Sequence, residues 1–120
     1  MVLWYSTDVT PMVLSDQVFL PALTRWRNAG CTAIVCYNDD IACQILPLLA
    51  KFGLSVPSDI SVVSFDNSHL CELATPPLTS LSHGSENVGH TAAKKLLALL
   101  NGEKVSSELI PWTLIERASG

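Results

Sequence analysis

Charged side chains are scarce in this sequence of 120 residues. Asp, Glu, Lys and Arg together make up 15% of the chain, whereas a soluble domain usually carries about 25%. Eleven acidic residues outnumber seven basic ones, which gives a net charge of −4 at pH 7. Contact with nucleic-acid phosphates requires clustered Lys and Arg, so we do not expect this segment itself to contact DNA or RNA. The low charge also predicts surface that another chain or domain covers.

Long hydrophobic runs are missing as well, and so are basic residues near the start of the sequence. The longest apolar runs, such as residues 96–100, are far shorter than the ~18 residues that span a bilayer. No basic residue precedes Arg25, whereas a secretory signal peptide begins with a positively charged segment. The sequence therefore predicts a cytoplasmic protein with no membrane association.

No cysteine pair has the CxxC spacing of a metal site, and no glycine-rich phosphate loop is present. Cysteines stand at positions 31, 36, 43 and 71. In an intracellular chain such cysteines are typically reduced thiols packed in a core. We therefore expect no metal, no disulfide and no cofactor.

Strand-like and helix-like segments alternate along the chain. Residues 32–37 and 60–65 are apolar runs of strand length, as in strands buried on both faces of a parallel sheet. Helical spacing joins them from Asp39 to a stop at Gly53, although Pro47 should disturb this helix near Cys43. The sequence therefore predicts an α/β fold. Further helices are predicted over residues 15–28 and 85–100, and further strands over 2–5, 78–81 and 109–115, the last at a sheet edge because of Pro111.

Polar clusters follow two of the predicted strands. The first is Tyr37, Asn38 and Asp39, and the second begins at Asp66. Ligands of parallel sheets bind beyond the carboxyl ends of the strands. Carboxylates and amides there pair well with sugar hydroxyls, and Tyr37 can cover the apolar face of a sugar ring. A turn explains Asn38 and Asp66 equally well, and Asp39 is interpreted as the cap of the following helix.

The same acidic cluster permits a different reading as a receiver-like phosphoacceptor. Adjacent carboxylates at strand ends can hold Mg²⁺ for phosphoryl transfer. That chemistry also needs a lysine at the end of a later strand, and none of the four lysines of the chain stands there. No Ser/His/Asp or Cys/His arrangement has a supporting motif, so we predict that the chain is not an enzyme.

Four segments in order carry a family resemblance. Residues 32–42 (TAIVCYNDDIA), 56–66 (VPSDISVVSFD), 77–81 (PLTSL) and 114–119 (LIERAS) resemble the effector domain of lac-repressor-like (LacI/GalR) transcription regulators. The runs around Tyr37, Asp66 and His83 are most similar to arabinose-responsive repressors, which join this domain to a winged-helix head. The resemblance implies a periplasmic-binding-protein-like fold in which two α/β subdomains enclose a sugar.

The resemblance also implies a division of the chain and a set of functional residues. Residues 1–77 would form the C-terminal subdomain, 78–108 would cross to a second, mostly missing subdomain, and 109–120 would return. Asn38, Asp66 and His83 match sugar-contacting positions of the family. A homodimer contact would use the helix after Asn38 and the loop after Asp66, namely Ile41, Ala42, Cys43, Leu46, Leu70 and Leu73.

Two substitutions and the length depart from the family. Ser64 stands where the family usually has Gly, and Asn67 where it often has Asp. A complete effector domain is more than twice as long as this chain. The sequence therefore predicts a fragment of a repressor that senses a monosaccharide, with L-arabinose as the expected effector and DNA bound only through an absent head. A periplasmic-type sugar-binding protein is the alternative.

Overall fold

The computed structural model describes residues 2–3 and 15–120, which alternate between strands and helices as the sequence predicts. Residues 4–5 of the strand predicted over 2–5 lie outside the described part. The elements are β1 (Val2–Leu3), α1 (Asp16–Asn28), β2 (Ala33–Val35), α2 (Asp39–Lys51), β3 (Ser61–Phe65), α3 (Leu70–Leu73), β4 (Thr79–Ser82), α4 (Ser85–Leu100) and β5 (Thr113–Ile115).

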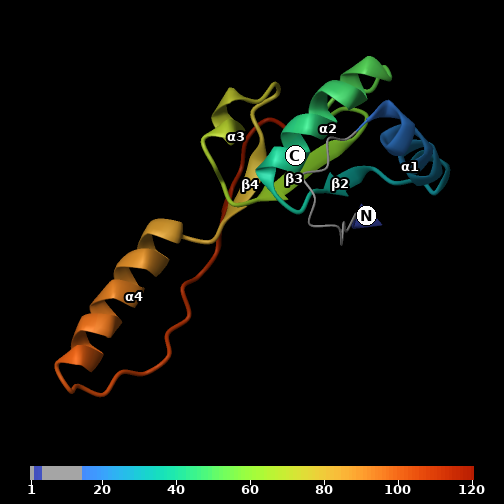
Figure 1. Ribbon diagram of the computed structural model, residues 1–120. Coiled ribbons are helices and arrows are strands. Elements are labelled where there is room, and N and C mark those ends of the chain that lie inside the picture. Colours follow the sequence, from blue (N-terminus) through green and yellow to red (C-terminus); the bar gives the residue numbers. More distant parts are fainter. Residues whose placement is uncertain (1, 4–14) are drawn as a thin grey trace.

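One mainly parallel sheet organises the molecule, with strand order β1-β2-β3-β4-β5. Strands β1 to β4 run parallel, and β5 pairs antiparallel with β4 at the edge. Since consecutive strands are neighbours, right-handed connections bring α1, α2 and α3 to the same side of the sheet, as Figure 1 shows. The α/β class and the edge position of the last strand are confirmed, although that strand is shorter than predicted and begins after Pro111.

The core lies between the helices and the sheet. Helices α1 and α2 both bury residues at three- and four-residue spacing. Phe19 meets Trp26 edge to face at 6.0 Å and stacks on Phe52 at 6.5 Å. Buried apolar side chains from these elements and the strands form one cluster: Phe19, Leu23, Trp26, Ile34, Cys36, Ala42, Ile45, Leu46, Leu49, Leu54, Ile60, Val62, Cys71 and Leu78.

Helix α2 runs through Pro47 without a break, so the disturbance predicted near Cys43 does not interrupt the helix. Proline removes one backbone donor, which leaves the carbonyl of Cys43 without its helical partner. Pro47 is exposed, so water can reach this side of the helix. The apolar stripe of α2 on the sheet holds the helix together across the missing bond.

Helix α4 and residues 101–112 extend away from the sheet, as Figure 1 shows. The chain measures 59 × 29 × 24 Å with a radius of gyration of 18.0 Å, whereas a compact chain of this length has roughly 14 Å. Helix α4 exposes its large apolar side chains Val88, Leu96, Leu97, Leu99 and Leu100. The described residues thus leave this helix without a covering layer.

Within the described residues, no helix combines the length and the apolar character needed to cross a bilayer.

Candidate functional site

Asn38 forms the N-cap of α2. Its backbone is extended, with φ −151° and ψ 173°, and its side-chain Oδ1 accepts a hydrogen bond of 3.0 Å from the Ile41 N–H. Among the described residues, nothing accepts a hydrogen bond from the side-chain amide nitrogen of Asn38. The prediction that Asp39 is the cap is wrong, because the cap needs an extended backbone and Asp39 is already the first helical residue.

The Asp39 carboxylate instead lies beneath the helix, where the residue is 2% exposed. Its Oδ1 accepts hydrogen bonds from the hydroxyl groups of Ser64 and Ser80, the latter at 2.7 Å. Its Oδ2 accepts from the backbone N–H of Ser68 at 2.6 Å. The carboxylate therefore joins α2, β3, the β3–α3 loop and β4 at one point.

The hydrogen bonds to Asp39 decide its charge state. Burial alone would raise the pKa of this carboxyl, but the donors on Ser64, Ser68 and Ser80 outweigh burial and hold the pKa below its usual value of 3.8. Ser64, at a position where the family resemblance implies a glycine, supplies one of these donors. The departure at this position therefore adds a bond to the buried anion.

A strained turn presents Asp66 at the end of β3. Asp66 and Asn67 have left-handed backbones, with φ 98° and 51°, which is costly for residues with a side chain. The turn is held because the Asp66 N–H donates to the Leu81 carbonyl at 2.9 Å and the Asn67 N–H donates to Ser80 Oγ at 3.0 Å. The Asp66 side chain remains 50% exposed, so its carboxylate is available to a ligand.

Arg117 fixes this turn from the C-terminal segment. Its guanidinium donates to Asn67 Oδ1 at 2.9 Å and to the Leu78 carbonyl at 2.8 Å. The side chain is only 16% exposed. The sequence predicts the motif that contains Arg117 but assigns it no role, because its partners are 39 and 50 positions away.

His83 meets Asp66 across the end of the sheet, with 3.4 Å between His83 Nε2 and Asp66 Oδ1. The register explains the meeting: Phe65 pairs with Leu81 in β3 and β4, so both side chains follow just beyond the paired residues. Asn38 lies on the same edge, because Val35 pairs with Val63 and each stands three residues before a polar site residue. The structure thus brings Asn38, Asp66 and His83 to one sheet edge.

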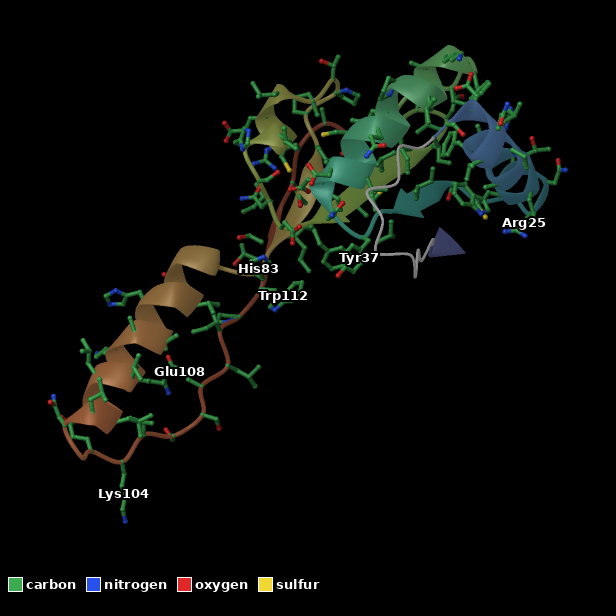
Figure 2. All side chains as sticks on the ribbon, viewed as in Figure 1. Arg25, Tyr37, His83, Lys104, Glu108 and Trp112 are labelled. Atoms are coloured by element: carbon green, nitrogen blue, oxygen red, sulfur yellow. The ribbon has the colours of Figure 1, made fainter. Side chains whose placement is uncertain are left out.

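Two aromatic side chains belong to this edge. Tyr37 is 66% exposed, and Trp112 is 56% exposed. Trp112 contacts His83 edge to face at 5.9 Å and Phe65 at 5.8 Å. Figure 2 shows Tyr37, His83 and Trp112 together where the α4 segment leaves the sheet. The sequence did not indicate Trp112 as a site residue, because a tryptophan within a predicted strand is more often a core residue than a surface for a ligand.

The six predicted dimer residues differ in exposure. Ala42 and Leu46 are 0% and 5% exposed in the core of the chain itself, so the prediction that they contact a partner is wrong; helical spacing turns them toward the sheet. Ile41, Cys43 and Leu70 are half-buried. Leu73 is 74% exposed.

The four cysteines are free thiols in the structure; Cys36 and Cys71 are buried, and Cys31 and Cys43 are half-buried. Burial raises the pKa of the Cys36 thiol to about 12, with smaller contributions from Cys43 and Asp39, and burial raises that of Cys71 to about 11. Such thiols are inert at neutral pH. Among the described residues, no three His, Cys, Asp or Glu side chains come together in a group that could hold a metal ion.

Two substitutions of Asn38 distinguish the contribution of its side-chain oxygen to the helix cap from that of its amide nitrogen. Asn38→Ala removes the acceptor for the Ile41 N–H and is expected to lower the free energy of unfolding by about 1 kcal/mol. Asn38→Ser retains an N-cap acceptor, so it should unfold within about 0.5 kcal/mol of the wild type. Urea denaturation followed by circular dichroism measures both. Equal destabilisation by the two variants would contradict the capping role.

Residues 6–120 match the family described as periplasmic binding protein-like domain. The chain belongs to this family, and its relatives include transcriptional repressors and LacI-type transcription regulators. It is 41% identical over 88 residues to the HTH-type transcriptional repressor PurR of Vibrio vulnificus. This match covers 73% of the present chain and 25% of that repressor. It is 38% identical over 83 residues to the arabinose metabolism transcriptional repressor of Geobacillus stearothermophilus. This match covers 69% of the present chain and 23% of that repressor.

A solved structure supports the same assignment. The periplasmic binding protein/LacI transcriptional regulator of Alkaliphilus metalliredigens, complexed with D-xylulofuranose, superposes with a TM-score of 0.67 at 32% identity. The match covers 73% of this chain and 34% of that one. The chain therefore spans about a third or less of the length of these relatives.

Proposed function

We propose that this chain is the C-terminal part of the sugar-sensing domain of a transcriptional repressor, with a monosaccharide held by Asn38, Asp66 and His83. The observation that carries the proposal is the meeting of Asp66 and His83 at 3.4 Å on the carboxyl edge of the sheet. The Asn38 amide lies on the same edge with its nitrogen unused among the described residues. L-Arabinose is the proposed effector.

The chemistry of this edge fits a polyol. A sugar hydroxyl both donates and accepts, so it can donate to the Asp66 carboxylate while it accepts from the Asn38 amide or the His83 imidazole. Bonds to the carboxylate are charge-assisted and therefore stronger. The exposed Tyr37 ring offers an apolar surface for C–H groups. The role is binding and not catalysis.

A receiver-like phosphoacceptor is less well supported by the same geometry. Such a site would use the acidic residues that follow β2 to hold Mg²⁺. The Asp39 carboxylate is instead buried and accepts three hydrogen bonds from serine residues. Both of its oxygens are occupied by donors.

Ligand control of DNA binding would come from closure of two subdomains. In this proposal residues 1–77 and 109–120 form one subdomain, and 78–108 belong to the other, which would cover the exposed apolar face of α4. A sugar shifts the equilibrium only by its differential affinity for the closed state, typically about 1–3 kcal/mol. The whole protein would be cytoplasmic and would contact DNA through a separate head.

A homodimer completes the proposal. Leu73 projects an exposed side chain from α3, and Ile41, Cys43 and Leu70 are half-buried beside the core. Apolar side chains left accessible in this way are typical of surface that a second copy covers. These four residues are the proposed contact.

Calorimetric titration of the full-length protein tests the function. We expect L-arabinose to bind best in a panel with D-xylose, D-glucose and D-galactose, and to change the affinity of the protein for the DNA upstream of its own gene. Asn38→Ser keeps the helix cap but lacks the amide, so it should weaken sugar binding about tenfold. Absence of binding by every sugar overturns the proposal. Sugar binding with no effect on DNA affinity supports a sugar carrier instead.

A further inference from the structure

Trp112 is an exposed aromatic residue whose position ordinary core packing does not explain. It lies just before β5, on the segment that returns from α4. Its two ring contacts, with Phe65 and His83, are both edge to face, with interplanar angles of 79° and 64°. More than half of the residue, 56%, remains exposed. The other described tryptophan, Trp26, is 4% exposed in the core.

We propose that Trp112 is a specificity-determining residue, whose indole packs against the apolar C–H face of the bound sugar. The inference rests on the proposed function, because it concerns the same sheet edge. It adds a residue from the return segment to a site otherwise built from residues that follow β2, β3 and β4.

His83 lies next to both the Trp112 indole and the Asp66 carboxylate. The imidazole contacts Trp112 on one side and reaches within 3.4 Å of Asp66 Oδ1 on another. His83 thus contacts both the carboxylate that would accept a sugar hydroxyl and the aromatic surface of Trp112. Figure 2 shows Trp112 beside His83, with Tyr37 on the same edge. Polar groups orient the hydroxyls, and the aromatic surface accepts the C–H groups between them.

An aromatic wall of this kind discriminates among sugars of the same size. Monosaccharides that differ at one carbon place a hydroxyl either on or away from a given ring face. A hydroxyl forced against the indole loses its hydrogen bonds to water and gains no partner there. Trp112 would therefore favour a sugar whose facing side carries C–H groups only, in addition to the discrimination that the hydrogen-bonding residues provide.

Three variants of the full-length protein test the role of Trp112, with L-arabinose and the three other sugars as probes. Trp112→Ala is expected to weaken binding of the preferred sugar at least about tenfold and to reduce its preference over the others. Trp112→Phe keeps an aromatic face and should bind within about threefold of the wild type. Trp112→Leu keeps apolar bulk but no ring face, and should behave like the alanine variant. Leu109→Ala, at a 95% exposed position on the same segment, is the control.

Tryptophan fluorescence supplies a readout that a purely structural role would not move. In the wild type, the preferred sugar should shift the emission, and Trp112→Phe should abolish this shift while it retains affinity. Wild-type affinity and preference in Trp112→Leu, with an intact melting temperature, would overturn the inference. In that case Asp66→Ala would still lose sugar binding and the proposed function would stand. If the wild type binds none of the sugars, both proposals are wrong.

Discussion

Replacement of Asp66 by alanine is expected to weaken sugar binding about 100-fold. The carboxylate is half-exposed at the end of β3 and faces His83. A sugar that donates two hydroxyls to it would form two charge-assisted hydrogen bonds, each of about 1.5 kcal/mol. Loss of both is about 3 kcal/mol, which corresponds to two powers of ten in affinity. Calorimetric titration of the full-length variant measures the change.

A second substitution at the same position separates binding from stability. Asp66 has a left-handed φ of 98°, where glycine is more favourable than any residue with a side chain. Asp66→Gly is therefore expected to lose affinity as Asp66→Ala does, without loss of thermal stability. Asp16→Ala makes the same change of charge on α1 and serves as the control. Near wild-type affinity in Asp66→Gly would show that the carboxylate does not bind the sugar.

Replacement of Asp39 by alanine has the largest expected effect on stability, a loss of about 3 kcal/mol. The substitution leaves the hydroxyls of Ser64 and Ser80 and the N–H of Ser68 without their acceptor. Because the carboxylate is 2% exposed, water reaches the vacated position poorly. Denaturant unfolding measures the loss. Asp40→Ala, at the exposed neighbour, should change stability by less than about 0.5 kcal/mol.

The charge of Asp39 also predicts a dependence of stability on pH. Folding lowers the pKa of this carboxyl below 3.8, because the serine donors outweigh the effect of burial. The stabilisation is therefore complete at pH values above 3.8 and is lost as the pH falls through the lower folded-state pKa. Asp39→Asn should remove this part of the acid sensitivity. An unchanged acid-unfolding curve in Asp39→Asn would contradict the assignment.

Most elements of the fold could be predicted from local pattern. The apolar runs around Ile34 and Val62 mark strands buried in a parallel sheet, and Phe19, Leu23 and Trp26 recur at helical spacing. Periodicity reports which face of a segment is buried, and this information lies within ten or so residues. Pro47 was misleading because propensity is local, whereas the packing that keeps α2 intact is tertiary.

The site could be predicted in part, for the same reason. Asn38, Asp66 and His83 follow strands, so parallel strand order alone brings them to one edge. The cap could not be assigned between Asn38 and Asp39 by residue type, because both accept hydrogen bonds and only the backbone angles distinguish them. Arg117 and Trp112 act through partners at least 29 positions away, and no local pattern encodes such contacts.

Because α4 extends away from the sheet, a small rotation where it leaves the sheet produces a large displacement at its far end. Helix α4 has 16 residues, so its axis is about 24 Å long. The chain leaves the sheet through His83 and returns past Trp112, and the two side chains touch. A rotation of about 0.1 radian at this point displaces the far end of the helix by roughly 2.4 Å, while atoms at the pivot move by only a small fraction of that. A sugar that binds beside His83 and Trp112 would therefore change the position of the far end of α4 and of any domain that packs on this helix.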